Sequence, residues 1–170
     1  ASLVDLLGSE TVATLRDAAN PAAIELRLVN EHPVAAGGVA LVRFFARTTV
    51  SSDEAGSALV LLVAGPDQAD GNRSYEGDFP LTRDWQEISV PFVWTRDFAP
   101  GEAVISLRFG FKRQTVEIGG LEAIDYGRTR ELASLPRTRF TYVGREANAP
   151  WRQAALARIE KIRGANFMRY

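Results

Sequence analysis

Charged and amide side chains alternate with apolar ones in residues 103–127, where they could bind a hydroxyl-rich ligand. Arg108, Lys112, Gln114 and Glu117 stand among Ile, Leu, Phe and Val residues that recur at almost every second position. A period of two sends successive side chains to opposite faces of a β-sheet. Planar guanidinium, amide and carboxylate groups form paired hydrogen bonds with hydroxyl groups. This polar face is therefore either ordinary solvated surface or a binding surface.

A second alternating segment, residues 39–49, adds to the polar face. Its small and aromatic members Ala40, Val42, Phe44 and Ala46 share one side, and its arginines share the other. If Phe44, Phe109, Val116 and Ile118 form the core, we expect one groove on the opposite face, with Phe45 as its aromatic platform. The side chains expected in this groove are Arg43, Phe45, Arg47, Arg108, Lys112 and Glu117, with Gln114 at the turn.

Two further aromatic residues are candidates for the rim of this groove. Trp94 ends a predicted strand near a turn, where it is either a rim platform or covered by the C-terminal tail. Tyr75 lies in a loop region and could close over a ligand. Trp85 and Trp151 are interpreted as structural residues.

Catalytic chemistry finds little support in the sequence. The single histidine, His32, lies in a turn and is interpreted as a solvated imidazole. No P-loop, GxGxxG or HExxH motif occurs. Glu87 and Glu117 could form an acid and base pair, but nothing in their spacing favours this role over surface or ligand contacts.

Composition argues against several classes of partner. The chain has 170 residues and a net charge of -1, which does not suit a nucleic-acid surface or an anionic membrane patch. No apolar run approaches the roughly 20 residues that span a bilayer. The absence of cysteine excludes disulfides and thiolate metal sites. Because the chain begins without Met or a signal peptide, we expect a mature form or an excised piece.

The order of elements predicts an all-β fold over the first 127 residues. About eight short strands separated by turns are expected: near 4–7, at 22–29, 39–49, 57–64, 75–79 and 86–94, and two within 103–127. Residues 57–64 form a nearly continuous apolar run, as in a strand buried on both faces. Pro91 indicates an edge strand or a bulge. The pattern predicts a β-sandwich or jelly roll.

The sequence changes character after Gly127. Residues 129–143 are expected to form an extended segment along the sandwich, and an amphipathic helix of about 13 residues is expected to begin at Pro150 and to end at Gly164. We therefore predict a sandwich module over 1–127, followed by an extended linker and one helix over 128–170 that lead towards an absent catalytic domain.

Two motifs resemble a known family. They are FGFKRQTVEIGGLEAIDYG (109–127) and SLPRTRFTYVGREANAPWRQAALARIEKIR (134–163). Both resemble the module that precedes the catalytic barrel in multimodular bacterial xylanases of glycoside hydrolase family 10. There, a sandwich similar to carbohydrate-binding modules of families 4, 9 and 22 ends in such a strand, and such a helix leads into the enzyme. The likeness covers roughly residues 40–163.

The resemblance implies a noncatalytic module, secreted or periplasmic, that binds xylan or a related plant cell-wall polysaccharide and targets a covalently linked family 10 enzyme. No nucleic-acid or membrane partner and no required cofactor are expected. Similar sandwiches often hold a structural calcium ion; Glu25, Glu122 and Asp125 are available ligands, and the metal is left unassigned. Two alternatives stay open: a structural module that packs on the catalytic domain without binding sugar, and a small independent hydrolase.

Overall fold

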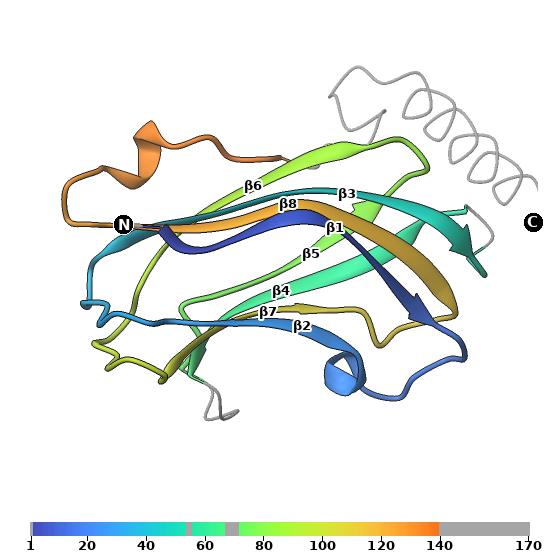
Figure 1. The fold of residues 1–170 in the computed structure, drawn as a ribbon, viewed down its shortest axis with the longest axis horizontal. Helices are drawn as coiled ribbons and strands as arrows, with labels where there is room; N and C mark the ends of the chain where they lie inside the picture. Colours follow the sequence, from blue (N-terminus) through green and yellow to red (C-terminus); the bar gives the residue numbers. More distant parts are fainter. Residues whose placement is uncertain (1, 54–55, 67–71, 140–170) are drawn as a thin grey trace, which may run out of the picture. The chain divides into compact units, whose positions relative to one another are not determined.

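The protein is a sandwich of two antiparallel β-sheets, as predicted (Figure 1). The computed structural model describes residues 2–53, 56–66 and 72–139, with side chains from residue 10 onward. Sheet A has the strand order β1-β8-β3-β6, and sheet B has the order β2-β7-β4-β5. The strand bounds are β1 Ser2–Thr14, β2 Glu25–Val29, β3 Val39–Ser51, β4 Ala58–Pro66, β5 Tyr75–Leu81, β6 Gln86–Val93, β7 Ala103–Arg108 and β8 Gln114–Gly127.

The remaining described segments are loops and two single turns of 3-10 helix. These turns are η1 (Pro21–Ala23) and η2 (Leu132–Ser134). Within the described part of the chain, no helix is long and apolar enough to cross a membrane. The predicted amphipathic helix that starts at Pro150 lies outside the described residues.

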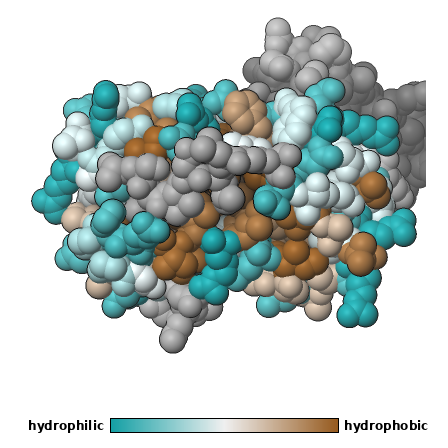
Figure 2. All heavy atoms as spheres, viewed as in Figure 1, coloured by the Kyte–Doolittle hydropathy of each residue, from teal (hydrophilic) through white to brown (hydrophobic). Residues whose placement is uncertain are grey.

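The core lies between the sheets and follows the predicted alternation. In β3 the residues Ala40, Val42, Phe44 and Ala46 are fully buried. In β4, Val60 and Leu62 face the core, and Leu61 and Val63 on the opposite face are only 8% and 5% exposed. The apolar run in this strand is therefore buried on both faces, as expected. In the view of Figure 2, hydrophobic residues gather along the middle of the molecule and hydrophilic residues surround them.

The connection between β7 and β8 crosses from one sheet to the other. β7 pairs with β2 and β4 in sheet B, and β8 pairs with β1 and β3 in sheet A. Phe109, directly after β7, is fully buried. At the start of β8, Gln114 accepts a hydrogen bond from the Leu59 amide (2.9 Å) and donates to the Leu59 and Phe109 carbonyls (2.7 and 3.3 Å). This side chain thus joins the first residue of β8 to β4 of the other sheet.

The segment after η2 covers the free edge of sheet A. β6 is an edge strand, which explains how Pro91 is tolerated within it. The amide of Ser89 donates to Thr138 Oγ1 (2.8 Å), and the amide of Thr138 donates to the Ser89 carbonyl (2.9 Å). The predicted extended segment therefore lies along the sandwich as far as Thr138, where the compact unit that begins at Ala1 ends. The division of the chain at residue 127 stays a prediction.

Replacement of Gln114 by Ala tests the link between the sheets. Gln114 is 3% exposed, and its loss leaves the Leu59 amide and the Leu59 carbonyl without their side-chain partner and removes one of the bonds to the Phe109 carbonyl. We expect the free energy of unfolding, measured by urea denaturation, to fall by about 2–4 kcal/mol. Gln86→Ala is the matched control, because Gln86 accepts only exposed bonds, from the amide and the hydroxyl of Thr82 (2.8 and 3.4 Å), and it should cost less than about 1 kcal/mol. Equal effects of the two variants would contradict this role.

Candidate functional site

The outer face of sheet B carries a polar group of side chains on an apolar floor. In the strand pairing Glu25 lies opposite Arg108, and Arg27 lies opposite Ser106. On the other side of β7, Arg108 is paired with Leu61 and Ser106 with Val63. Because alternate residues share a face, these side chains all point away from the core.

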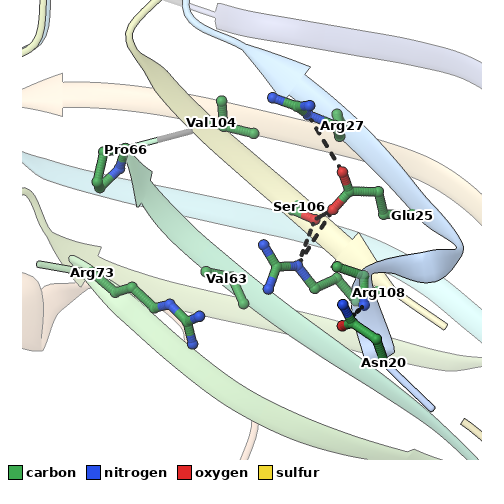
Figure 3. A pocket seen from close by; sticks show the side chains of 10 residues that line it. Asn20, Glu25, Arg27, Val63, Pro66, Arg73, Val104, Ser106 and Arg108 are labelled. Atoms are coloured by element: carbon green, nitrogen blue, oxygen red, sulfur yellow. Dashed lines mark hydrogen bonds and ion pairs between the residues drawn. The ribbon is translucent and has the colours of Figure 1, made fainter. Parts of the chain in front are cut away.

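This face is hollowed into a pocket of about 400 Å³ (Figure 3). β2 and β7 supply its polar wall, β4 supplies part of its apolar floor, and a residue just before β5 reaches it from the other side. The lining residues are Asn20, Ala22, Glu25, Arg27, Val63, Pro66, Arg73, Val104, Ser106 and Arg108.

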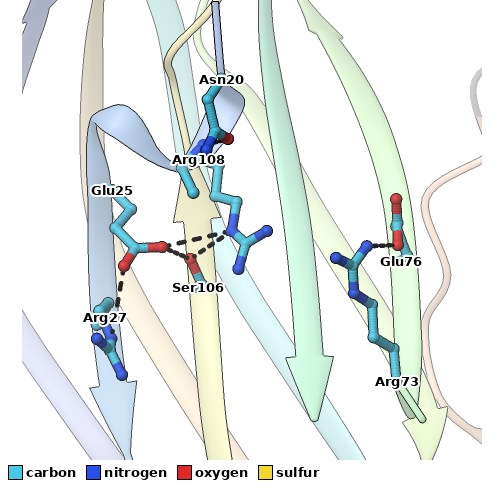
Figure 4. Close-up of polar contacts among 8 residues, drawn as sticks. Asn20, Glu25, Arg27, Arg73, Glu76, Ser106 and Arg108 are labelled. Carbon is cyan, nitrogen blue, oxygen red and sulfur yellow. Dashed lines mark hydrogen bonds and ion pairs between the residues drawn. The ribbon is translucent and has the colours of Figure 1, made fainter. Parts of the chain in front are cut away.

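A carboxylate organises the polar wall (Figure 4). Ser106 Oγ donates to Glu25 Oε2 at 2.6 Å, and Arg108 Nε lies 3.4 Å from the same oxygen. Arg108 Nε also donates to Ser106 Oγ at 3.2 Å. Arg27 Nε lies 3.6 Å from the second oxygen, Glu25 Oε1. The Glu25 carboxylate is therefore held from both sides, and it fixes the Arg108 side chain through Nε.

The terminal nitrogens of Arg108 remain available. Neither Nη1 nor Nη2 has a hydrogen-bond partner among the described residues. In Figures 3 and 4 this end of the guanidinium points away from Glu25. Arg73 contributes a second guanidinium from the opposite side of the pocket, and it forms an ion pair with Glu76. The pocket can thus donate hydrogen bonds from two sides.

The predicted single groove is wrong, because its members lie on opposite faces of the sandwich. Arg43, Phe45, Arg47 and Glu117 belong to β3 and β8, so they lie on the outer face of sheet A. Arg108 belongs to β7 and lies on the outer face of sheet B. The two segments are close in sequence, but the crossing after β7 separates their polar faces.

On sheet A the predicted arginines have partners of their own. Arg43 Nη2 lies 2.7 Å from Glu122 Oε2, and Arg47 Nε lies 2.6 Å from Glu117 Oε2. The Arg47 guanidinium also lies over the Trp85 ring, 4.8 Å from its centroid. Phe45 is 43% exposed beside this row. The side chains on this face are therefore mutually paired, and they border neither of the two pockets described here.

Two predicted contact residues, Trp94 and Gln114, are packed in the interior, and a third, Tyr75, is half-buried. Trp94 is 1% exposed between Phe92 and Phe98, so it cannot serve as a sugar platform. Gln114 is buried in the link described above. Tyr75 points to the core side of β5, with its ring centroid 6.0 Å from that of Phe92.

The phenol of Tyr75 is partly withdrawn from solvent. Burial raises the pKa of Tyr75 above its ordinary value of 10.0; the charge of Arg137 opposes this shift, and that of Asp78 adds to it. A Tyr75 that closed over ligand from a loop would be solvated instead. Packing against Phe92 thus explains why Tyr75 does not reach the pocket.

Lys112 lies in the crossing between β7 and β8. Its side chain is 68% exposed, and Nζ lies 3.9 Å from Asp53 Oδ2. It borders a second, mainly apolar pocket of about 350 Å³ at the start of β4, together with Leu59, Pro80 and Phe111. Of the predicted binding residues that remain exposed, only Arg108 lies in the larger pocket.

Sequence reasoning missed most of the residues around that pocket. Glu25 and Arg27 alternate with apolar neighbours in β2, so a period-two pattern in the sequence is consistent with their place on a polar face. Their pairing with β7 was not visible, because register between distant segments leaves no local signal. Arg73 lies in a turn-rich region without periodicity and gave no signal at all.

The proposed calcium ligands do not converge. Glu25 belongs to β2 of sheet B, whereas Glu122 and Asp125 belong to β8 of sheet A. No group of three or more His, Asp or Glu side chains able to hold a metal is found in the described ranges. Glu25 and Glu122 instead contact arginines. A structural calcium elsewhere stays a prediction. His32 is exposed, as expected.

Comparison with known proteins identifies the fold. No protein-family model and no curated protein matches the sequence. Among solved structures, one described as "CBM4 structure and function" matches with a TM-score of 0.58 and 14% identity, over 69% of this chain and 83% of that one. The N-terminal cellulose-binding domain of β-1,4-glucanase C from Cellulomonas fimi matches with a TM-score of 0.54 and 13% identity, over 69% of this chain and 78% of that one. The ligand-free module "BiXyn10A CBM1" matches with a TM-score of 0.51 and 19% identity, over 68% of this chain and 72% of that one. The chain has the β-sandwich fold of carbohydrate-binding modules.

Two tryptophan variants test the assignment of the interior. Trp94→Ala removes a buried ring from the Phe92 and Phe98 cluster, and we expect a loss of about 3–5 kcal/mol in the free energy of unfolding. Trp85→Ala makes the same change at a side chain that is 44% exposed, and it should cost less than about 1 kcal/mol. Chemical denaturation followed by circular dichroism measures both. A Trp94→Ala protein as stable as the parent would refute the buried position.

Proposed function

We propose that the protein is a noncatalytic carbohydrate-binding module that holds a plant cell-wall polysaccharide, xylan or a related β-glycan, in the pocket on sheet B. The fold shared with carbohydrate-binding modules supports the general role. The choice of a xylan-type ligand, and of an attached family 10 glycoside hydrolase, is supported by the sequence motifs at 109–127 and 134–163. A module with this role would work where the polysaccharide is, as a secreted or periplasmic protein.

The observation that carries the proposal is the open end of Arg108 in the pocket of about 400 Å³. A sugar ring needs donors and acceptors at its rim and an apolar surface under its C–H face. The pocket offers the guanidinium groups of Arg108 and Arg73 above the apolar side chains of Val63 and Val104. On sheet A, by contrast, Arg43 and Arg47 are held by carboxylates at 2.7 and 2.6 Å.

Such a pocket supports targeting more readily than tight binding. None of the described residues that line it is aromatic, so these residues provide no stacking platform. A covalently linked enzyme nevertheless gains from a weak module, because tethering converts encounters with the polymer into intramolecular ones.

Affinity electrophoresis of the isolated chain tests the proposal. The protein should migrate more slowly in native gels that contain soluble xylan. Arg108→Ala should weaken retardation about tenfold or more, since hydrogen bonds from a charged donor contribute about 1.5–3 kcal/mol. Arg43→Ala is the matched control on the opposite face, and its retardation should equal that of the parent.

Several outcomes of this experiment would contradict the proposed function. Absence of retardation in xylan, mixed-linkage glucan and mannan would contradict sugar binding and favour a structural module. If Arg43→Ala loses retardation and Arg108→Ala keeps it, the binding site lies on sheet A instead. Thermal unfolding of each variant verifies that the fold is intact. Release of reducing sugar by the isolated chain would contradict a noncatalytic role.

A further inference from the structure

We propose that the pocket on sheet B selects a sugar that carries a carboxylate, namely a uronic acid side group on the polysaccharide. This inference rests on the proposed function and specifies its ligand. Three features of the pocket lead to it: an excess of arginine, a carboxylate whose charge is already compensated, and a floor without an aromatic ring (Figure 3).

The charges of the lining residues favour an anion. Among the described lining residues, Arg27, Arg73 and Arg108 outnumber the single carboxylate Glu25. Arg73 is also paired with Glu76 at the rim, so the attraction for an anion rests mainly on Arg108. The whole chain has a net charge of -1, so this local excess runs against the overall balance. A neutral sugar would gain nothing from it.

Glu25 does not cancel the attraction for an anion. Its Oε2 accepts the Ser106 hydroxyl at 2.6 Å and faces Arg108 Nε at 3.4 Å, and its Oε1 faces Arg27 Nε at 3.6 Å. Both oxygens therefore already face donors or cations within the wall. Because only Nε of Arg108 takes part, the parallel N–H groups of Nη1 and Nη2 form an open fork. Such a fork matches the two oxygens of a carboxylate.

Partial burial strengthens the interaction of this fork with a carboxylate. The Arg108 side chain is 21% exposed and that of Arg73 is 31% exposed. Interactions between charges in such positions are screened less by salt and water than those on an open surface. A carboxylate on a sugar, with a pKa of about 3 to 4, is ionised at pH 7.

The uncharged part of the pocket suits the rest of a sugar ring. Val63, Pro66 and Val104 give an apolar floor without a stacking platform, so specificity must come from polar groups. Asn20 uses its side-chain oxygen to accept the Ala22 amide at 2.9 Å. Its amide nitrogen has no hydrogen-bond partner among the residues that the structure describes, and it can donate to a hydroxyl.

Two oligosaccharides that differ in one group test the inference. The first is a xylo-oligosaccharide with one glucuronic acid side group, and the second is the same compound after reduction of its carboxyl to a hydroxymethyl group. By isothermal titration calorimetry at pH 7 and 20 mM NaCl, we expect the acid to bind about tenfold or more tightly. The preference should shrink at 300 mM NaCl because the interaction is ionic.

Three variants test whether the preference for the acidic oligosaccharide comes from the Arg108 fork. Arg108→Gln keeps a polar side chain of similar reach, and it should bring the two affinities within about twofold of each other. Arg43→Gln makes the same change on sheet A and should keep the full preference. Arg73→Gln, across the pocket, should reduce the preference partly.

The outcomes separate this inference from the proposed function. Equal binding of the acid and its reduced form overturns the inference and leaves the carbohydrate-binding function intact. Binding of neither compound, in the concentration range where soluble xylan retards the protein, also overturns the inference. Absence of binding to these compounds and to every polysaccharide overturns both. A preference that persists in Arg108→Gln, with that variant folded, would contradict the role given to the fork.

Discussion

The short crossing between β7 and β8 is the constraint on which the arrangement of this molecule depends. Phe109 anchors it in the core: its amide donates to the Ile24 carbonyl at 2.8 Å, and its own carbonyl accepts the Thr14 hydroxyl at 2.8 Å. Gln114 then ties the first residue of β8 to Leu59 in β4. Because the chain changes sheet within residues 109–113, the polar residues of β7 and those of β8 point to opposite sides of the sandwich. Two separate polar faces result, and each must be judged by itself.

The two faces differ in how completely their arginines are paired with carboxylates. On sheet A, Arg43 and Arg47 face Glu122 and Glu117 in one-to-one pairs. Exposed pairs of this kind contribute only about 0–1 kcal/mol to stability, but they leave little capacity for a ligand. On sheet B a single carboxylate organises the wall, and the end of Arg108 stays open. This surplus of donors over acceptors is the reason why the proposed binding face is that of sheet B and not that of sheet A.

Alternation in the sequence was sufficient to predict the fold but not the site. Local sequence patterns predicted the burial of Phe44 and Phe109 through periodicity, the two buried faces of β4 through a continuous apolar run, and an edge or a bulge at Pro91 through proline. Periodicity cannot tell which sheet a strand joins, because that choice depends on pairing between segments far apart in the chain. Trp94 was misplaced for a related reason: the loop that brings Phe98 against it follows the strand and has no period of its own. The family resemblance indicated the class of fold, but it did not indicate which face of the sandwich would bind a ligand.

In the proposed function, polysaccharide contacts sheet B and not sheet A. A titration of the ¹⁵N-labelled protein with a xylo-oligosaccharide that carries a glucuronic acid side group, followed by NMR, distinguishes the two faces. We expect shifts in the amides of Glu25, Arg27 and Ser106 and in the Nε–H of Arg108, with the amides of Arg43 and Phe45 unchanged. Shifts confined to β3 and β8, or no shifts at saturating oligosaccharide, would contradict binding at sheet B.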